Sequence, residues 1–177
     1  MPCYDAPKGV DRDALPAALR DDAILLPLYE YWAAQRGDRA FPDRADISPH
    51  GIGPKLLPHV GLAEIDAANL PESRLRLLGT ALVTELGFDP TGMKVKDYAS
   101  GEHLDSLVAL ATLMLEHRKP VFGEAPFFVQ PHRSLVARRL YLPLSHGGSE
   151  PSLMLFGQTF HRPADAAAFR RITHAVL

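Results

Sequence analysis

The sequence contains a single cysteine, Cys3, among its 177 residues. One cysteine excludes an intramolecular disulfide and is typical of a reducing compartment, so the cytoplasm is the expected location. The N-terminus lacks the basic start and the apolar run of a signal peptide. No apolar stretch approaches the roughly 20 residues needed to cross a bilayer. We therefore expect no association with a membrane.

An excess of charge of one sign is also lacking. The 19 Lys and Arg residues nearly balance the 21 Asp and Glu residues, and the formal net charge is −2 at pH 7. This balance gives no electrostatic argument for nucleic-acid binding, and we expect none. Hydrophobic residues make up 46% of the chain, which is enough for the core of one globular domain.

The common patterns of catalytic and metal sites are missing as well. The chain has no GxSxG serine motif, no HExxH pattern and no glycine-rich phosphate loop after a strand. Its eight histidines are scattered, without the paired spacing of metal ligands. The sequence therefore predicts a protein that is not an enzyme and that has no metal site.

The N-terminal third contains one strong helix signal and one loop signal. Asp22–Arg36 repeats apolar residues at helical spacing behind an Asp N-cap, with regular helix from about Leu26. A shorter helix within Asp11–Arg20 fits the pattern but has few residues to bury. Prolines and glycines crowd residues 37–58 and predict an ordered loop with at most one helical turn, around Pro54–Leu57.

The remaining sequence predicts strands interrupted by helices. Five strands are expected, at His59–Asp66, Ser73–Thr80, Val121–Gln130, Ser134–Leu144 and Leu153–Phe160. Within the strand at 134–144, Arg138 and Arg139 are adjacent and must point to opposite faces of the sheet.

Helices are expected between and after these strands. Thr80–Leu86 predicts one or two turns closed by Gly87, and Gly101–Arg118 predicts the longest helix. A terminal amphipathic helix is expected at Asp165–Val176. The apolar stripe of the long helix consists of Leu104, Leu107, Val108, Ala111, Met114 and Leu115.

Several short motifs follow one another in a characteristic order. They are Tyr31-Trp32, Pro42-x-Arg44-Ala-Asp46-Ile47-x-Pro49, Leu56-Leu57-Pro58, Arg76-Leu-Leu-Gly79-Thr80, Gly87-x-x-x-Thr91-Gly92 and Leu142-Pro143-Leu144-Ser145. Together with the element order, they resemble a bacterial PAS subfamily typical of short alphaproteobacterial proteins. The similarity covers about Tyr29 to Phe160.

The resemblance implies an α+β fold with a five-stranded antiparallel sheet in the order 2-1-5-4-3. Helices would cover the concave face, and further helices would flank the sheet at both ends of the chain. Four segments are then expected: an N-terminal extension (1–21), an N-terminal helix with the proline-rich loop (22–58), the PAS core (59–162) and a C-terminal helix (163–177).

The resemblance also implies a non-catalytic sensory or regulatory domain with a small cavity between the sheet and the long helix. Aromatic walls with a few polar tips are typical of such cavities, and an arginine fork suits an anionic ligand at the rim. Arg76 could instead lie on a solvated face or pair with an acid such as Asp46. The expected ligand-binding residues are Arg76, Thr80, Tyr98, Leu107, Ala111, Phe122 and Tyr141.

The resemblance does not identify a cofactor. Haem-binding relatives place a histidine on the long helix, but His103 and His117 lie about 80° and about 120° from Ala111, so neither points squarely at the cavity. Covalent flavin chemistry in light-sensing relatives needs a cysteine on the helix after strand two, and Thr80–Leu86 has none. We expect neither group, and the small molecule stays unidentified.

The first strong helix has two compatible interpretations. Its residues Leu28, Tyr29 and Trp32 are expected either to pack on the outer face of the sheet or to form a homodimer interface. Because about 15 residues after the last strand are too few for an output domain, we expect the signal to pass to a protein partner. One alternative is a ligand-free adaptor whose cavity is filled by its own side chains. Another is a small α+β-cone enzyme, which would need an Asp–His pair inside the pocket.

Overall fold

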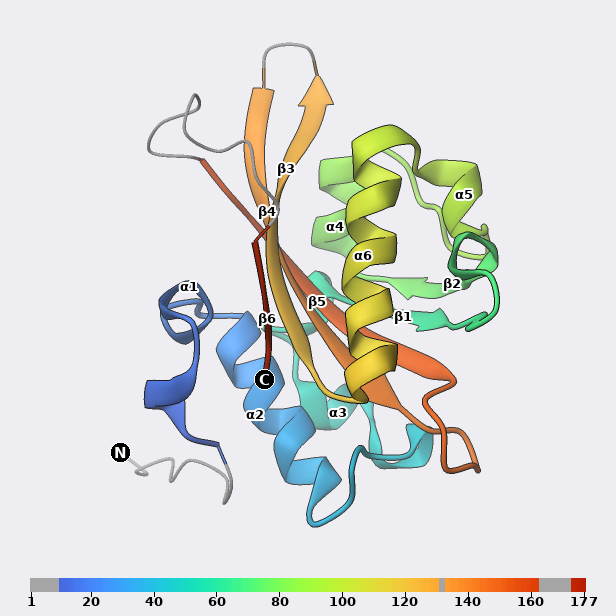
Figure 1. Ribbon diagram of the computed structural model, residues 1–177. Helices are drawn as coiled ribbons and strands as arrows, with labels where there is room; N and C mark the ends of the chain where they lie inside the picture. The colour runs from blue at the N-terminus through green and yellow to red at the C-terminus, as the bar shows by residue number, and fades with distance from the viewer. Residues whose placement is uncertain (1–9, 131–132, 163–172) are drawn as a thin grey trace.

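The computed structural model describes residues 10–130, 133–162 and 173–177 (Figure 1). Its centre is an antiparallel sheet with the strand order β2-β1-β5-β4-β3-β6. The strands are β1 (Val60–Glu64), β2 (Arg74–Leu78), β3 (Val121–Gln130), β4 (Arg133–Leu144), β5 (Leu153–His161) and β6 (Thr173–Val176). The predicted α+β fold and the order 2-1-5-4-3 are therefore confirmed, and β6 adds a sixth strand.

Strand β6 corrects the expectation of a helix over Asp165–Val176. Thr173–Val176 pairs antiparallel with β3, from Val121 opposite Val176 to Glu124 opposite Thr173. The edge of β3 presents unpaired backbone N–H and C=O groups, and a segment containing Thr and Val pairs readily with such an edge. The rest of the expected C-terminal helix, residues 163–172, lies outside the described residues.

Helices cover both faces of the sheet (Figure 1). α4 (Thr80–Leu86), α5 (Val95–Tyr98) and α6 (Gly101–His117) lie on one face, hereafter the α6 face. α2 (Leu25–Arg36) lies on the opposite face, hereafter the α2 face, where it contacts β4 and β5. The bounds of α4, α6 and α2 agree with the sequence predictions to within a few residues.

Alternation along β4 assigns each side chain to a face. Leu140, Leu142 and Leu144 join the apolar cluster around α2, whereas Tyr141 joins the cluster around Leu110 and Met114 of α6. Every second residue of a strand points to the same side. Arg139 therefore shares the α6 face with Tyr141.

A glycine lets α2 lie close to the sheet. A Cβ atom on Gly157 of β5 would be 2.5 Å from Leu28 and 2.8 Å from Leu25. The carboxylate of Asp22 accepts hydrogen bonds from the backbone N–H groups of Leu25 and Ile24 and so caps the start of α2. The helix itself begins at Leu25 with Ile24 directly before it, later than the predicted N-cap at Asp22.

The N-terminal segment is more buried than the sequence suggested. It forms two short helices, η1 (Arg12–Ala14) and α1 (Ala17–Arg20). Leu19 is fully buried in the cluster around α2. Arg12 forms an ion pair with Glu30, a buried residue of α2.

The proline-rich loop contains three short helical turns where we expected at most one. They are η2 (Arg44–Asp46), α3 (Pro49–Ile52) and η3 (Leu57–His59). A further turn, η4 (Leu70–Glu72), connects β1 to β2. Capping by Asp43 and Ser48 and prolines early in two of the turns account for these short helices.

Candidate ligand-binding site

A cavity of about 70 Å³ lies between the α6 face of the sheet and the helices α4, α5 and α6. By the same measure a single water molecule needs about 10–15 Å³, so the space suits a small molecule of several non-hydrogen atoms. Most of the wall is apolar. It includes Ala63, Leu75, Leu82, Leu107, Ala111, Met154 and Phe156.

Five polar side chains interrupt the apolar wall. Ser73 precedes β2, Tyr98 ends α5, His103 lies in the first turn of α6, Tyr141 comes from β4 and Gln158 from β5. Within the described part of the chain, the hydroxyls of Tyr98 and Tyr141 and the Gln158 amide nitrogen have no hydrogen-bond partner. Groups of this kind fix the orientation of a ligand in an otherwise apolar pocket.

Arg139 lies beside these polar groups and is completely buried. Its Nε–H donates to Gln158 Oε1 at 3.1 Å, and its Nη1 donates to Ser106 Oγ of α6 at 3.0 Å. The third nitrogen, Nη2, is buried without a hydrogen-bond partner. Among the residues that the structure describes, no carboxylate forms an ion pair with Arg139.

The neighbouring titratable groups do not balance this charge. Burial, aided by the charge of Arg139, lowers the pKa of His103 to about 4, so its imidazole is neutral at pH 7. Burial raises the pKa of Tyr141 to about 12 and also raises the pKa of Tyr98, so both phenols stay protonated. Burial lowers the pKa of Arg139, but a guanidinium keeps its proton in proteins.

Four of the seven predicted ligand-binding residues line the cavity: Tyr98, Leu107, Ala111 and Tyr141. Their role in binding stays a prediction. The structure places the other three elsewhere.

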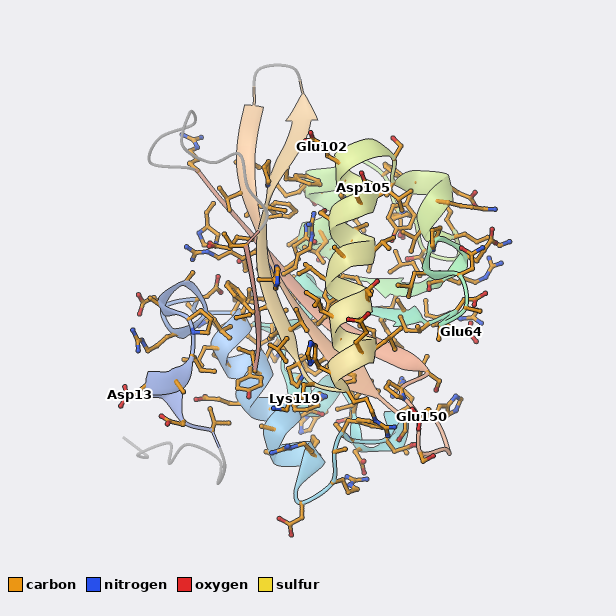
Figure 2. The ribbon with its side chains drawn as sticks, in the orientation of Figure 1. Asp13, Glu64, Glu102, Asp105, Lys119 and Glu150 are labelled. Carbon is orange, nitrogen blue, oxygen red and sulfur yellow. The ribbon has the colours of Figure 1, made fainter. Side chains whose placement is uncertain are left out.

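Strand alternation explains two of the misplaced residues. Arg76 is exposed on β2 and forms an ion pair with Glu64, which lies at the end of β1 (Figure 2). Its neighbour Leu75 points into the cavity instead. Phe122 is buried in the cluster on the α2 face, opposite Leu140 in the register, and therefore points away from the cavity.

Thr80 is misplaced for a different reason. It is exposed as the first residue of α4, and its carbonyl accepts a hydrogen bond from Thr84 Oγ1 at 2.9 Å. The wall of the cavity is formed instead by Leu82 and Leu86 of the same helix.

His103 lines the cavity, contrary to the expectation from the sequence. Ala111 is not the centre of the buried face of α6, which lies nearer Leu110, a residue that is 1% exposed. His103 precedes Leu110 by seven residues and so lies only about 20° from it. The exposed Glu102 and Asp105 mark the other side of the same turns (Figure 2). His117 is exposed at the end of α6.

Within the described residues, nothing at His103 forms the Asp–His pair that the cone-enzyme alternative requires. Its ring packs edge-on against Phe127, with 5.3 Å between the ring centroids. The same part of the chain contains no group of three His, Cys, Asp or Glu side chains placed to hold a metal ion.

The residues expected at a dimer interface are mostly covered by the chain itself. Leu28 and Trp32 are buried against the sheet, and the Trp32 indole Nε1 donates to the Pro143 carbonyl at 3.0 Å. Only Tyr29 is partly exposed. Leu28 and Trp32 therefore pack against the chain's own sheet, as expected for the first interpretation, and the homodimer interface stays a prediction.

No described helix has the length and apolar character to span a membrane.

Comparison with known proteins identifies one family. Residues 21–158 match the family model of the PAS domain. No curated protein matches the chain.

Several solved structures are similar to parts of the chain. A light-oxygen-voltage domain studied with a flavin analogue has 12% identity and a TM-score of 0.48 over 62% of this chain and 82% of that chain. The Rhodobacter sphaeroides LOV protein has 13% identity and a TM-score of 0.46, over 62% of this chain and 63% of that protein, less than two thirds of its length. A fungal LOV-domain photoreceptor has 14% identity and a TM-score of 0.40, over 56% of this chain and 73% of that chain.

Proposed function

This chain belongs to the PAS-domain family, whose members are generally sensory and signalling modules, and we propose that it binds a small molecule in the cavity beneath α6. Occupancy of the cavity would then change the activity of a separate partner protein. The domain itself would not catalyse a reaction. Its single cysteine supports a site of action in a reducing compartment such as the cytoplasm.

The observation that carries this proposal is the composition of the cavity wall. Apolar side chains surround the space, and Tyr98, Tyr141 and Gln158 are among the few polar residues that line it. A mostly apolar pocket with a few polar groups is typical of a small-molecule site, which supports a bound ligand. The adaptor alternative instead requires that the chain's own side chains fill this space.

The β4–β5 pair offers a route from the cavity to the opposite face. Arg139 and Gln158 are register partners on the α6 face, and the next pair, Arg138 and Thr159, lies on the α2 face. Thr159 Oγ1 donates to the carboxylate of Asp22 at 2.7 Å, and this carboxylate caps α2. We propose that a ligand touching Gln158 shifts β5 and thereby changes how α2 docks, which is a population shift between two packings.

Ligand binding is tested by filling the cavity from α6. Ala111 lines the cavity, whereas Ala109, two residues earlier on the same helix, is exposed. Ala111→Leu is expected to abolish ligand binding and to raise the stability of the ligand-free protein, because filling a cavity stabilises by about 0.5–2 kcal/mol. Ala109→Leu adds the same atoms in solvent and is the matched control.

Two measurements give the result. Native mass spectrometry of the purified protein reports retained small molecules and subunit stoichiometry, and a thermal-shift screen finds compounds that bind. Trp32 is the only tryptophan and lies on α2, so its fluorescence reports helix displacement when a hit is added.

The outcomes separate the candidate functions. Hits that bind the native protein and the Ala109→Leu variant but not the Ala111→Leu variant support the proposal. A Trp32 signal that changes with those hits supports transmission to α2. No hit across a broad screen, together with a stable dimer in the mass spectrum, would favour the adaptor alternative. Turnover of a bound compound would contradict a non-catalytic role.

A further inference from the structure

We infer that the cavity binds a small monocarboxylate with an apolar body, and that Arg139 recognises the carboxylate. This inference rests on the proposed ligand-binding function and specifies its chemistry. It starts from a charge that the protein buries without compensation.

The burial of Arg139 is unusual because its charge lacks a partner. Two of the five N–H groups of the guanidinium donate, to Gln158 and to Ser106, which leaves three N–H groups unused. Both acceptors are neutral, and none of the described carboxylates pairs with the side chain. Charges removed from water in folded proteins are normally paired, so an anion is the missing component.

Arg139 adjoins the cavity through Gln158 and is not itself one of the residues that line it. Gln158 accepts its Nε–H and is itself a lining residue. Nη2 has no hydrogen-bond partner. Together with Nη1, it can donate to the two oxygens of one carboxylate in a bidentate contact. His103 and Tyr141, which feel the charge of Arg139 in their pKa values, also line the cavity.

The balance of charge favours a monoanion over a phosphate. Arg139 is the one cation near the cavity among the described residues that is completely buried. A single positive charge matches a single negative charge, whereas a doubly charged phosphate would leave one charge uncompensated in an apolar site. The planar guanidinium fork also matches the geometry of a carboxylate.

The apolar residues of the cavity wall indicate that the part of the ligand away from the carboxylate is apolar. Leu75, Leu82, Leu107 and Met154 offer only apolar contacts. A cavity of about 70 Å³ accommodates a short hydrocarbon chain behind the carboxylate. The hydroxyls of Tyr98 and Tyr141 and the Gln158 amide can donate to the carboxylate oxygens that Arg139 leaves free.

The test compares acids with their neutral isosteres. The probes are propionate, isobutyrate and isovalerate, each paired with its primary amide, which has nearly the same size and shape. Sodium chloride at equal concentration controls for ionic strength. Binding is measured as the rise in Tm with ligand concentration and as Kd by isothermal titration calorimetry.

Arg139→Met removes the charge and keeps much of the side-chain length. It is expected to weaken carboxylate binding by about 30-fold or more, as expected when one member of a buried charge pair is lost. Arg138→Met removes the neighbouring charge on the other face and is expected to change binding little. If Arg139→Met does not fold, Arg139→Lys, which keeps the charge but loses the fork, is expected to weaken binding to a smaller extent.

Each result decides the inference. Carboxylates that stabilise the native protein while their amides do not, with the effect lost in the Arg139→Met variant, support it. Equal binding of acids and amides would overturn it and leave the proposed sensory function intact, because the cavity would then bind neutral molecules. Stabilisation by chloride alone, or no response to any of the acids, would also overturn it. The Ala111→Leu comparison then decides separately whether the cavity binds other ligands.

Discussion

Arg138 and Arg139 are neighbours on β4, but the pleat of the strand sends their guanidinium groups to opposite faces of the sheet. Arg138 lies on the α2 face, where its Nε is 2.9 Å from Glu124 Oε1 and its Nη1 is 3.9 Å from Asp22 Oδ2. Arg139 lies on the α6 face, where its described hydrogen-bond partners are a neutral serine and a neutral glutamine. One arginine is therefore compensated by carboxylates of the chain, and the other has no carboxylate partner among the described residues.

On the α2 face, the contacts of Asp22 predict how much the docking of α2 contributes to the free energy of unfolding. The Asp22 carboxylate caps the helix and accepts the Thr159 hydroxyl, so Asp22→Ala removes both contacts at a buried position. We expect a loss of about 1–3 kcal/mol in the free energy of unfolding, measured by urea denaturation. Asp21→Ala, at an exposed neighbouring position, is the control. Equal effects of the two substitutions would contradict the role of Asp22.

Ser106 provides a test of the hydrogen bonding around Arg139. Ser106→Ala removes the acceptor of the Nη1 N–H and leaves a buried charged donor unpaired. We expect a loss of about 1.5–3 kcal/mol in unfolding free energy, and a smaller loss when Arg139→Met is already present. Ser100→Ala serves as the control because Ser100 is exposed and its side chain does not cap α6. An equal loss of unfolding free energy from Ser106→Ala in the native protein and in the Arg139→Met variant would contradict the hydrogen bond between Ser106 and Arg139.

Acid should release the loop that Asp43 anchors. Hydrogen bonds from the backbone of Ala45 and Gly147 and from the Ser145 hydroxyl lower the pKa of Asp43 from 3.8 to about 2. A depressed folded-state pKa means that the ionised carboxylate stabilises the fold above about pH 4 and that this contribution is lost as the pH falls toward 2.

The pH dependence can be measured with a matched pair of variants. We expect Asp43→Asn to lose less stability than the native protein between pH 4 and pH 2, measured from urea midpoints at each pH. Asp38→Asn, at an exposed position, is expected to follow the native curve. An unchanged pH profile for Asp43→Asn would rule out this anchor.

Gly79 is a position where only glycine fits. A Cβ atom there would lie 2.3 Å from the carbonyl oxygen of Pro58, and a backbone atom cannot move aside as a flexible side chain does. Gly79→Ala is expected to destabilise the protein by about 1–3 kcal/mol in thermal or urea unfolding. Gly148→Ala is the control, because nothing lies within 4 Å of the corresponding Cβ. Equal stability of both variants would show that η3 can shift away from α4.

Most of the fold was predictable from local patterns. α4 begins and ends where the glycines and apolar residues indicated, and β3 agrees with its predicted bounds. Such elements depend on hydrophobic period and on capping within a few residues. The C-terminal prediction was wrong at Thr173–Val176 because pairing with the distant edge of β3 overrides a weak amphipathic pattern.

The cavity was predictable in part. Tyr141 and Ala111 line it as predicted, because strand alternation and the helical stripe can be read along the chain. The prediction placed Phe122 on the wrong face. Alternation shows that every second residue of a strand shares a face, but it does not show which of the two sets faces α6 and which faces α2. The prediction for His103 was wrong, because an error of one residue in the centre of a helical stripe changes every angle measured from it by about 100°.

By itself, the sequence determined that this chain forms a PAS-type α+β domain, and that Arg138 and Arg139 must point to opposite faces, since both follow from period, turns and motif order. Only the tertiary structure decided which of the two is compensated. Glu124, Asp22 and Ser106 come from separate segments of the chain, and their meeting with β4 depends on how α2 and α6 dock on the two faces of the sheet.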